Sequence, residues 1–123
     1  MSLSRTLCSI LIASLPLFAA ADDKVYPVSA RIIDPVTPDV RGSKYEGPLD
    51  AALKEAKLGE VVGGGNSVTK QGKIEWVGVD IELSDLTKGI PFLKEKLREL
   101  GAPAGSTLDY HAGNKKVSLA VGK

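Results

Sequence analysis

Acidic and aromatic side chains alternate with apolar ones along residues 74–83. Val77, Val79, Ile81 and Leu83 occupy odd positions, and the even positions carry a second set of side chains: Trp76, Gly78, Asp80 and Glu82. Because successive side chains of a strand point to opposite faces, the apolar set predicts a face packed on a core. The even set predicts a polar face that remains in contact with solvent.

Two other β-rich stretches place chemically active side chains on the same predicted face. Arg31 lies in residues 25–33, and Asp109 and His111 alternate in residues 107–112. In the ferredoxin-like strand order, which the whole pattern predicts, residues 25–33 lie between the other two stretches. Arg31 would then lie amid their carboxylates. One guanidinium, three carboxylates, an imidazole and an indole would form a polar binding surface. The candidate binding residues are therefore Arg31, Trp76, Asp80, Glu82, Asp109 and His111.

The same residues could in principle do acid–base or metal chemistry. His111 is a candidate general base, Asp80 with Glu82 a candidate acid–base pair, and Asp80, Glu82 and Asp109 a candidate set of oxygen ligands for a cation. However, the sequence has no nucleophile motif of the G-x-S-x-G kind and no EF-hand spacing. We therefore assign no catalytic residue, no metal ligand and no cofactor, and enzymatic activity stays an open alternative.

Three consecutive glycines, Gly63 to Gly65, lie before Asn66 and Ser67. A phosphate-binding loop would need the GxxxxGK[ST] spacing and a following helix, and neither is present. The segment is more typical of a bulged or twisted strand end that enters a hairpin. A further alternative is that its bare backbone accepts an extended strand from a partner.

The first 21 residues have the pattern of a signal peptide. Arg5 gives a positive start, residues 7–18 form an apolar run too short to span a bilayer, and small residues at 19–21 predict cleavage after Ala21. This predicts an exported protein, periplasmic or secreted, with no membrane segment after cleavage. The predicted domains are a signal peptide at 1–21 and a single domain at 22–123.

The charge balance excludes some partners. The chain carries 16 basic and 15 acidic residues, and removing the leader takes away only Arg5, which leaves equal numbers. Broad binding of nucleic acid or anionic membrane needs a basic excess or patch, so neither is expected. The only cysteine, Cys8, lies in the leader, and His111 is the only histidine, so disulfides and ordinary structural zinc sites are not expected.

The elements that must position these residues follow from periodicity and breakers. Residues 34–47, with Pro35, Pro38, Gly42 and Gly47, predict a long loop. Gly47-Pro48 predicts the start of a first helix and Gly59 its end. Leucine and isoleucine at three- and four-residue spacings from Leu86 to Leu100 predict a second helix, capped by Asp85 or Thr87. The predicted order is strand 25–33, loop 34–47, helix to Gly59, strand from Glu60, strand 74–83, helix 86–100, and strands before and after Gly113-Asn114.

Gly113-Asn114 is a two-residue hairpin signal. It pairs His111 with Lys116, Asp109 with Ser118 and Leu108 with Leu119, which gives each strand one apolar and one polar face. The whole order is β-α-β-β-α-β plus a last strand, the split βαβ pattern. We therefore predict an α+β, ferredoxin-like βαββαβ sandwich with an extra C-terminal strand and two helices on one face of an antiparallel sheet, the other face being open.

Several short strings carry a resemblance to a known group. They are Gly47-Pro48-Leu49-Asp50, Leu58-Gly59-Glu60-Val61, Gly63-Gly64-Gly65, Val79-Asp80-Ile81-Glu82-Leu83 and the stretch Leu97 to Pro103. Across residues 45–110 the chain resembles small, uncharacterised bacterial ferredoxin-like domains. The resemblance implies a fold and no established activity.

The leading functional hypothesis is an exported, non-catalytic binding module whose partner is another protein, with inhibitor or immunity-type roles as examples. Its surface would be the predicted open face together with loop 34–47. The alternative is a small hydrolase or phosphoryl-group enzyme that uses Arg31 with His111 or Asp109. A sensor for a small ligand or cation is a third hypothesis. The oligomeric state is left open, although an exposed sheet edge could pair with its twin.

Overall fold

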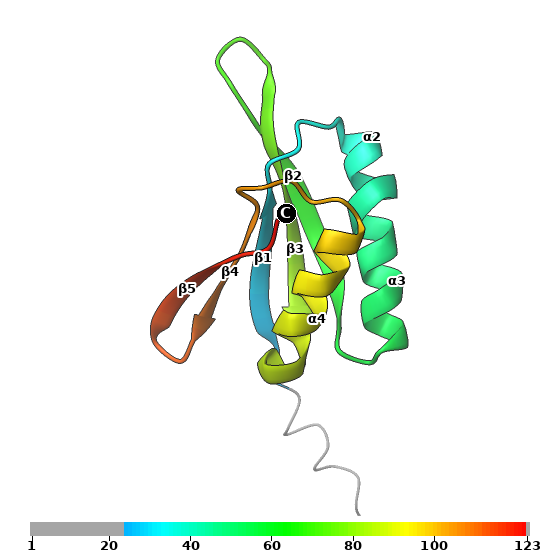
Figure 1. Cartoon of the computed structure of the whole chain (residues 1–123), viewed down its shortest axis with the longest axis vertical. Coiled ribbons are helices and arrows are strands. Elements are labelled where there is room, and N and C mark those ends of the chain that lie inside the picture. The colour runs from blue at the N-terminus through cyan, green and yellow to red at the C-terminus, as the bar shows by residue number, and fades with distance from the viewer. Residues whose placement is uncertain (1–23, 123) are drawn as a thin grey trace, which may run out of the picture.

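A five-stranded antiparallel sheet forms one layer of the protein (Figure 1). The computed structural model describes residues 24–122, so the predicted leader lies outside the described residues. The strand order across the sheet is β2-β3-β1-β4-β5. Helical segments cover one face and leave the other open, which confirms the predicted α+β class. The strands are β1 (Tyr26–Ile32), β2 (Gly59–Val68), β3 (Ile74–Leu83), β4 (Thr107–Ala112) and β5 (Lys115–Ala120).

The core lies between the sheet and the helices. Alternation along β1 and β3 buries one side of each strand, as the sequence predicts, and leaves Ser29 and Asp80 exposed on the other side. Burial of this apolar surface is the main force that holds the two layers together. The largest fully buried side chains include Ile32, Tyr45, Leu49, Leu53, Ile81, Leu83, Leu93, Leu97 and Leu108.

The predicted loop 34–47 is wrong over most of its length. A continuous helical segment runs through α2 (Pro38–Arg41), the π turn η2 (Gly42–Glu46) and α3 (Gly47–Glu55). Thr37 caps its start, because its side chain accepts a hydrogen bond from the amide of Val40. Pro38 fits the first helical position, where its missing amide costs nothing.

Gly47-Pro48 therefore lies inside the helical segment and does not start it. Pro48 cannot donate an amide, and in a regular α-helix its ring would collide with the carbonyl of Lys44. The π turn, which includes a bond from the amide of Gly47 to the carbonyl of Gly42, widens the helix just before this proline.

Gly59 does not end the helix either. The cap is Ala56, and Lys57 takes the left-handed conformation (φ 58°) that a glycine usually provides. Gly59 instead begins β2, opposite Leu83 of β3.

Helix α4 (Leu86–Glu99) begins where the sequence predicts. Of the two candidate residues, Asp85 is the N-cap: its side chain accepts a hydrogen bond from the amide of Lys88 at 3.0 Å. Pro91 lies inside the helix, on its exposed side.

Replacing Asp85 with alanine should lower the free energy of unfolding by about 1 kcal/mol, because one amide of the first turn loses its acceptor. Urea unfolding followed by circular dichroism measures this loss. Thr87→Ala is the matched control and should change stability by less than about 0.5 kcal/mol. A larger loss at Thr87 than at Asp85 would contradict the assignment of the cap.

The hairpin register is confirmed. Leu108 pairs with Leu119, Asp109 with Ser118 and His111 with Lys116, as the two-residue turn predicts. Strand β1 pairs with both β3 and β4, so it lies at the centre of the sheet.

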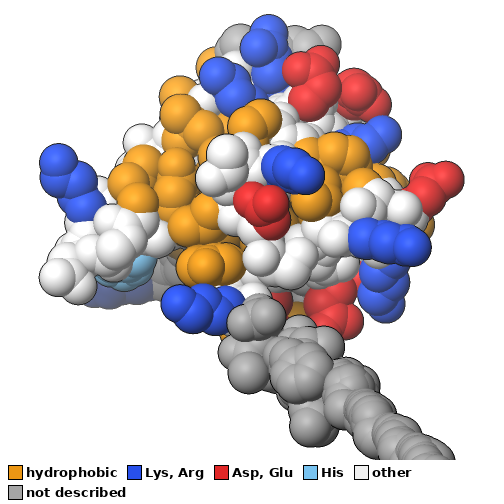
Figure 2. All heavy atoms as spheres, turned by 90° about the horizontal axis from the view of Figure 1, so that it is seen from below, with side chains coloured by type: hydrophobic (Ala, Val, Ile, Leu, Met, Phe, Trp, Pro, Cys, Tyr) orange, Lys and Arg blue, Asp and Glu red, His pale blue; other side chains and the backbone are white. Residues whose placement is uncertain are grey.

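The hairpin β4–β5 extends to the side of α4, so apolar side chains come to the surface there. Figure 2, which views the molecule from the lower end of Figure 1, shows apolar side chains gathered on this end. A pocket of about 400 Å³ between α4 and β4 is lined by Leu86, Thr87, Ile90, Pro91, Tyr110 and Ala112.

No helix within residues 24–122 is long and apolar enough to cross a membrane.

Candidate functional site

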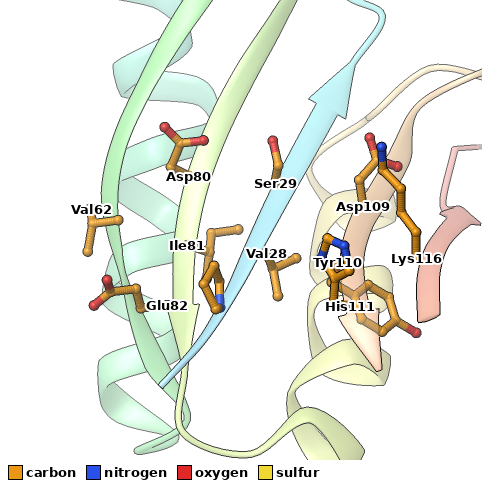
Figure 3. A pocket seen from close by; sticks show the side chains of 11 residues that line it. Val28, Ser29, Val62, Asp80, Ile81, Glu82, Asp109, Tyr110, His111 and Lys116 are labelled. Atoms are coloured by element: carbon orange, nitrogen blue, oxygen red, sulfur yellow. The ribbon is translucent and has the colours of Figure 1, made fainter. Parts of the chain in front are cut away.

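The open face, defined here as the sheet surface turned away from the helices, brings most of the candidate residues together. Its centre is Ser29 of β1, which pairs in register with Asp80 of β3 on one side and Asp109 of β4 on the other. Figure 3 shows these three side chains in a row across three neighbouring strands. Ser29 and Asp80 are exposed and Asp109 is half-buried.

A pocket of about 290 Å³ lies against this row. It combines carboxylates with apolar surface and with the basic side chains of β4 and β5, a mixture suited to binding. Four of the six predicted residues line it: Asp80, Glu82, Asp109 and His111. The other lining residues are Pro27, Val28, Ser29, Val62, Ile81, Tyr110 and Lys116.

Asp109 is held in place by the neighbouring strand. The hydroxyl of Ser118 donates to Asp109 Oδ1 at 2.6 Å, across the pair that the hairpin register sets. This bond fixes the rotamer of the carboxylate and leaves its second oxygen available for another donor.

Arg31 makes no ion pair with the carboxylates within residues 24–122, although its register partners Gly78 and Thr107 each lie two residues from one of them, Asp80 and Asp109. Its guanidinium carbon lies 4.7 Å from the centroid of the Trp76 ring, which is a cation–π distance. Arg31 pairs in register with Gly78, two residues from Trp76 along β3. The indole lies beside Gly78: a β-carbon placed there would be in ordinary van der Waals contact with Trp76 Cζ3, at 3.5 Å.

The Trp76 side of the open face carries a second, shallower pocket of about 360 Å³. Glycines and small polar residues form its floor, and Trp76 is half-buried at its side. Asp80 borders both pockets, so it connects the Trp76–Arg31 pair to the carboxylate row. The lining residues are Ser29, Gly64, Gly65, Asn66, Ser67, Trp76, Gly78 and Asp80.

Among residues 24–122, the charged groups of the open face make no ion pair with one another. The four ion pairs found among residues 24–122 all lie in the helical segments or the connection before them. These four pairs are Arg41–Glu46, Lys44–Asp34, Lys54–Asp50 and Lys96–Glu99. On the open face, by contrast, Glu60 of β2 pairs in register with Glu82 of β3, and two like charges in this position lower stability.

His111 is exposed and lines the pocket of the carboxylate row. Within the described part of the chain, no hydrogen bond joins its ring to a carboxylate or a hydroxyl. In the same residues, no group of three or more His, Cys, Asp and Glu side chains is close enough to hold a metal ion.

The triple glycine is a bulged strand, as its sequence favours. The register of β2 with β3 shifts between Val61 and Gly63, and Val62, at this shift, lines the pocket. Alternation from Glu60 already places Val62 on the open face, but the candidate residues were chosen among charged and aromatic side chains, so Val62 was passed over.

Gly64 has a separate reason to lack a side chain. The side chains of Arg41 and Glu46, which bond to each other at 2.7 Å, lie over it, and a β-carbon would collide with them. Arg41 also donates to Asn66, whose amide donates in turn to the carbonyl of Val36 at 3.0 Å. This polar cluster fastens the helical segment to β2.

Comparison with known proteins finds no family model, no curated protein and no solved structure that matches the chain. The resemblance to small bacterial ferredoxin-like domains therefore stays a prediction. Function has to be inferred from the open face.

Proposed function

We propose that the chain is an exported, non-catalytic protein-binding module that uses its open face. The observation that carries this proposal is the charge arrangement of that face. Asp80, Glu82 and Asp109 make no ion pair within residues 24–122, whereas the helical side of the molecule contains four. Charges kept apart from one another on one exposed surface are available to a partner.

The Trp76–Arg31 pair supports a protein as the partner. Tryptophan and arginine are the residue types most enriched among the strong contributors to protein interfaces. The indole is already fixed over Gly78 and stacked on Arg31, so little conformational entropy is lost when a partner covers it. Two shallow pockets that share Asp80 suit an extended contact better than an enclosed small ligand.

We also propose that the fold is ferredoxin-like and that the protein is exported. The strand order β2-β3-β1-β4-β5 supports a ferredoxin-like arrangement to which β5 is added at one edge. The signal-peptide pattern of residues 1–21 supports export to the periplasm or the outside of the cell.

Trp76→Ala should weaken binding to the partner about tenfold or more, because it removes the aromatic anchor and its stacking on Arg31. The partner is first captured from an exported-protein fraction on the immobilised chain and then purified. Its affinity for each variant is measured by calorimetry. Trp76 is the only tryptophan in the chain, so its fluorescence should also change when that partner binds.

Val40→Ala is the matched control, because Val40 is an exposed apolar residue of α2, on the other side of the molecule. It should leave the affinity unchanged, and unfolding curves should show that both variants fold. Asp80→Asn should weaken binding as well, since Asp80 borders both pockets. Equal affinity for the wild type, Trp76→Ala and Asp80→Asn would refute the proposed surface.

A further inference from the structure

The two edges of the sheet differ in their protection against pairing with a further strand. At one edge, β5 carries two adjacent exposed lysines, Lys115 and Lys116, which disfavour such pairing. At the other edge, β2 has no charged side chain from Val61 to Val68. An uncharged edge of this length is a template for an extended segment of another protein, which would add to the sheet as an extra strand.

The helical segment borders β2 on one side of the sheet. Asp50 of α3 accepts a hydrogen bond from the amide of Val61 at 3.0 Å, which occupies the edge at that residue. Farther along, the Arg41–Glu46 pair lies over Gly64 on the helical side. The β2–β3 hairpin then extends past the helices, as Figure 1 shows. An added strand would therefore meet side chains of the helical segment on one side and the open face on the other.

On the open face, the middle of β2 is bare backbone. Gly63 pairs in register with Asp80 of β3, and Gly65 pairs with Gly78. A β-carbon at Gly63 would lie 3.6 Å from Asp80 Oδ2, and one at Gly65 would have no atom within 4 Å. Neighbouring strands lie about 5 Å apart, so long side chains of a strand added beside β2 can reach across these glycines to β3.

The two glycine positions offer different surroundings to such side chains. Opposite Gly63, a side chain reaches the carboxylate of Asp80, which is exposed and makes no ion pair within residues 24–122, so a cation is favoured. Opposite Gly65, it reaches the pocket of about 360 Å³ that Trp76 borders, which favours an aromatic ring. In antiparallel pairing, the residue opposite Gly65 comes two positions before the residue opposite Gly63.

We propose that the partner binds by adding an extended segment antiparallel to β2, with a lysine or arginine at Asp80 and an aromatic residue, two positions earlier, against Trp76. Glu60 and Glu82, which form the next register pair on the open face, add to the attraction for the cation. The added strand also covers Val62, which is 51% exposed. This inference rests on the proposed function, because the segment occupies the pockets of the open face, and it specifies the chemistry of the partner.

A synthetic peptide tests this mode of binding without the natural partner. The probe is acetyl-Thr-Val-Phe-Thr-Lys-Val-Thr-amide, and the control peptide exchanges its phenylalanine with its lysine. In NMR titrations of the purified chain, the probe should bind with a dissociation constant on the order of 100 µM, at least about tenfold tighter than the control peptide. With the probe bound, the amides of residues 63–67 that point away from β3 should exchange with solvent at least about tenfold more slowly, because they donate to the added strand.

Variants of the edge locate the contact on the chain. Val62→Lys places a cation at the β2 edge and should weaken binding of the probe at least about tenfold. Ala120→Lys adds the same charge at an exposed position of β5, the opposite edge, and is the matched control, with an expected change below about twofold. Gly63→Thr places a side chain between the added strand and Asp80 and should weaken binding about fivefold. Unfolding curves should show that the three variants fold.

Several results would overturn strand addition at β2. They are a probe that does not bind at millimolar concentration, a control peptide that binds as tightly as the probe, unchanged amide exchange in β2, and equal effects of Val62→Lys and Ala120→Lys. If the captured partner still loses affinity with Trp76→Ala in that case, the proposed function stands and only the mode of binding is refuted. Equal affinity of that partner for the wild type and Trp76→Ala would instead refute the proposed function itself.

Discussion

Replacing Gly59 with alanine is expected to lower the free energy of unfolding by about 3 kcal/mol. A β-carbon at Gly59 would collide with the carbonyl oxygen of Glu82 and lie 3.0 Å from the Cα of Leu83. Both atoms belong to the backbone of β3, so no side-chain rotation relieves the collision. The start of β2 would have to move away from β3, with loss of the strand pairing there. Urea unfolding followed by far-UV circular dichroism measures the change.

Gly65→Ala provides a matched control in the same strand. No atom lies within 4 Å of a β-carbon at that position, so the fold accepts the methyl group. Its effect should stay within about 0.5 kcal/mol, and the lower chain entropy of alanine in the unfolded state favours a small gain. Equal losses for the two variants would show that loss of glycine in general, and not the contact with Glu82, sets the cost.

Gly59 also shows how a sequence can indicate a special residue for the wrong reason. The glycine after an apolar helical stripe predicts a helix end, but the chain makes that end with Ala56 and Lys57. Gly59 is required by the close approach of β3, a contact between segments far apart in sequence. Local patterns cannot reveal such a contact.

Strands with a two-residue alternation of apolar and polar side chains, and hairpins with a characteristic turn sequence, could be predicted from the sequence. Strand β3 follows a strict two-residue period, and the register of β4 with β5 follows from a two-residue turn whose flanking residues agree on both faces. The segment after β1 was not predictable in the same way. Its prolines and glycines are typical of a loop, but Thr37 and Pro38 make a helix start, and a π turn accommodates Pro48.

The sequence predicts which side of the sheet carries the candidate residues, but it does not predict which of their side chains contact one another. Alternation places Arg31, Trp76 and Asp80 on one side of the sheet. Their grouping depends on contacts between neighbouring strands, because the indole lies beside Gly78 and Arg31 stacks on it. A cation beside an aromatic ring gains from the ring quadrupole without the cost of a rigid ion pair. Charge counting alone therefore could not predict that Arg31 stacks on Trp76.

A buried tyrosine connects the end of β1 to the helical segment. Tyr45 is fully buried, and its hydroxyl donates to Asp34 Oδ2 at 2.6 Å. Lys44 donates to the same oxygen at 2.8 Å. Burial and the hydrogen bond to Asp34 raise the pKa of Tyr45 to about 12. Burial alone would raise the pKa of Asp34, but the hydrogen bonds from Lys44 and Tyr45 keep it below its ordinary value.

Alkaline pH should therefore destabilise the protein through Tyr45. Between pH 10 and 12 the unfolded chain loses this phenolic proton and the folded chain keeps it, so stability falls as pH rises, by about 2 kcal/mol. Tyr45→Phe should cost about 1 kcal/mol at pH 7, because a hydrogen bond is lost.

The variant should lack the alkaline loss due to this residue and become more stable than the wild type near pH 12. The difference between the urea-unfolding curves of the two proteins reports the loss of the Tyr45 hydroxyl together with its effect on Lys44, whose pKa the hydrogen bond to Asp34 raises most and Tyr45 raises further. Parallel losses in both proteins from pH 10 to 12 would show that its hydroxyl ionises as readily in the folded chain as in the unfolded one. The contact with Asp34 would then be too weak to join β1 to the helical segment.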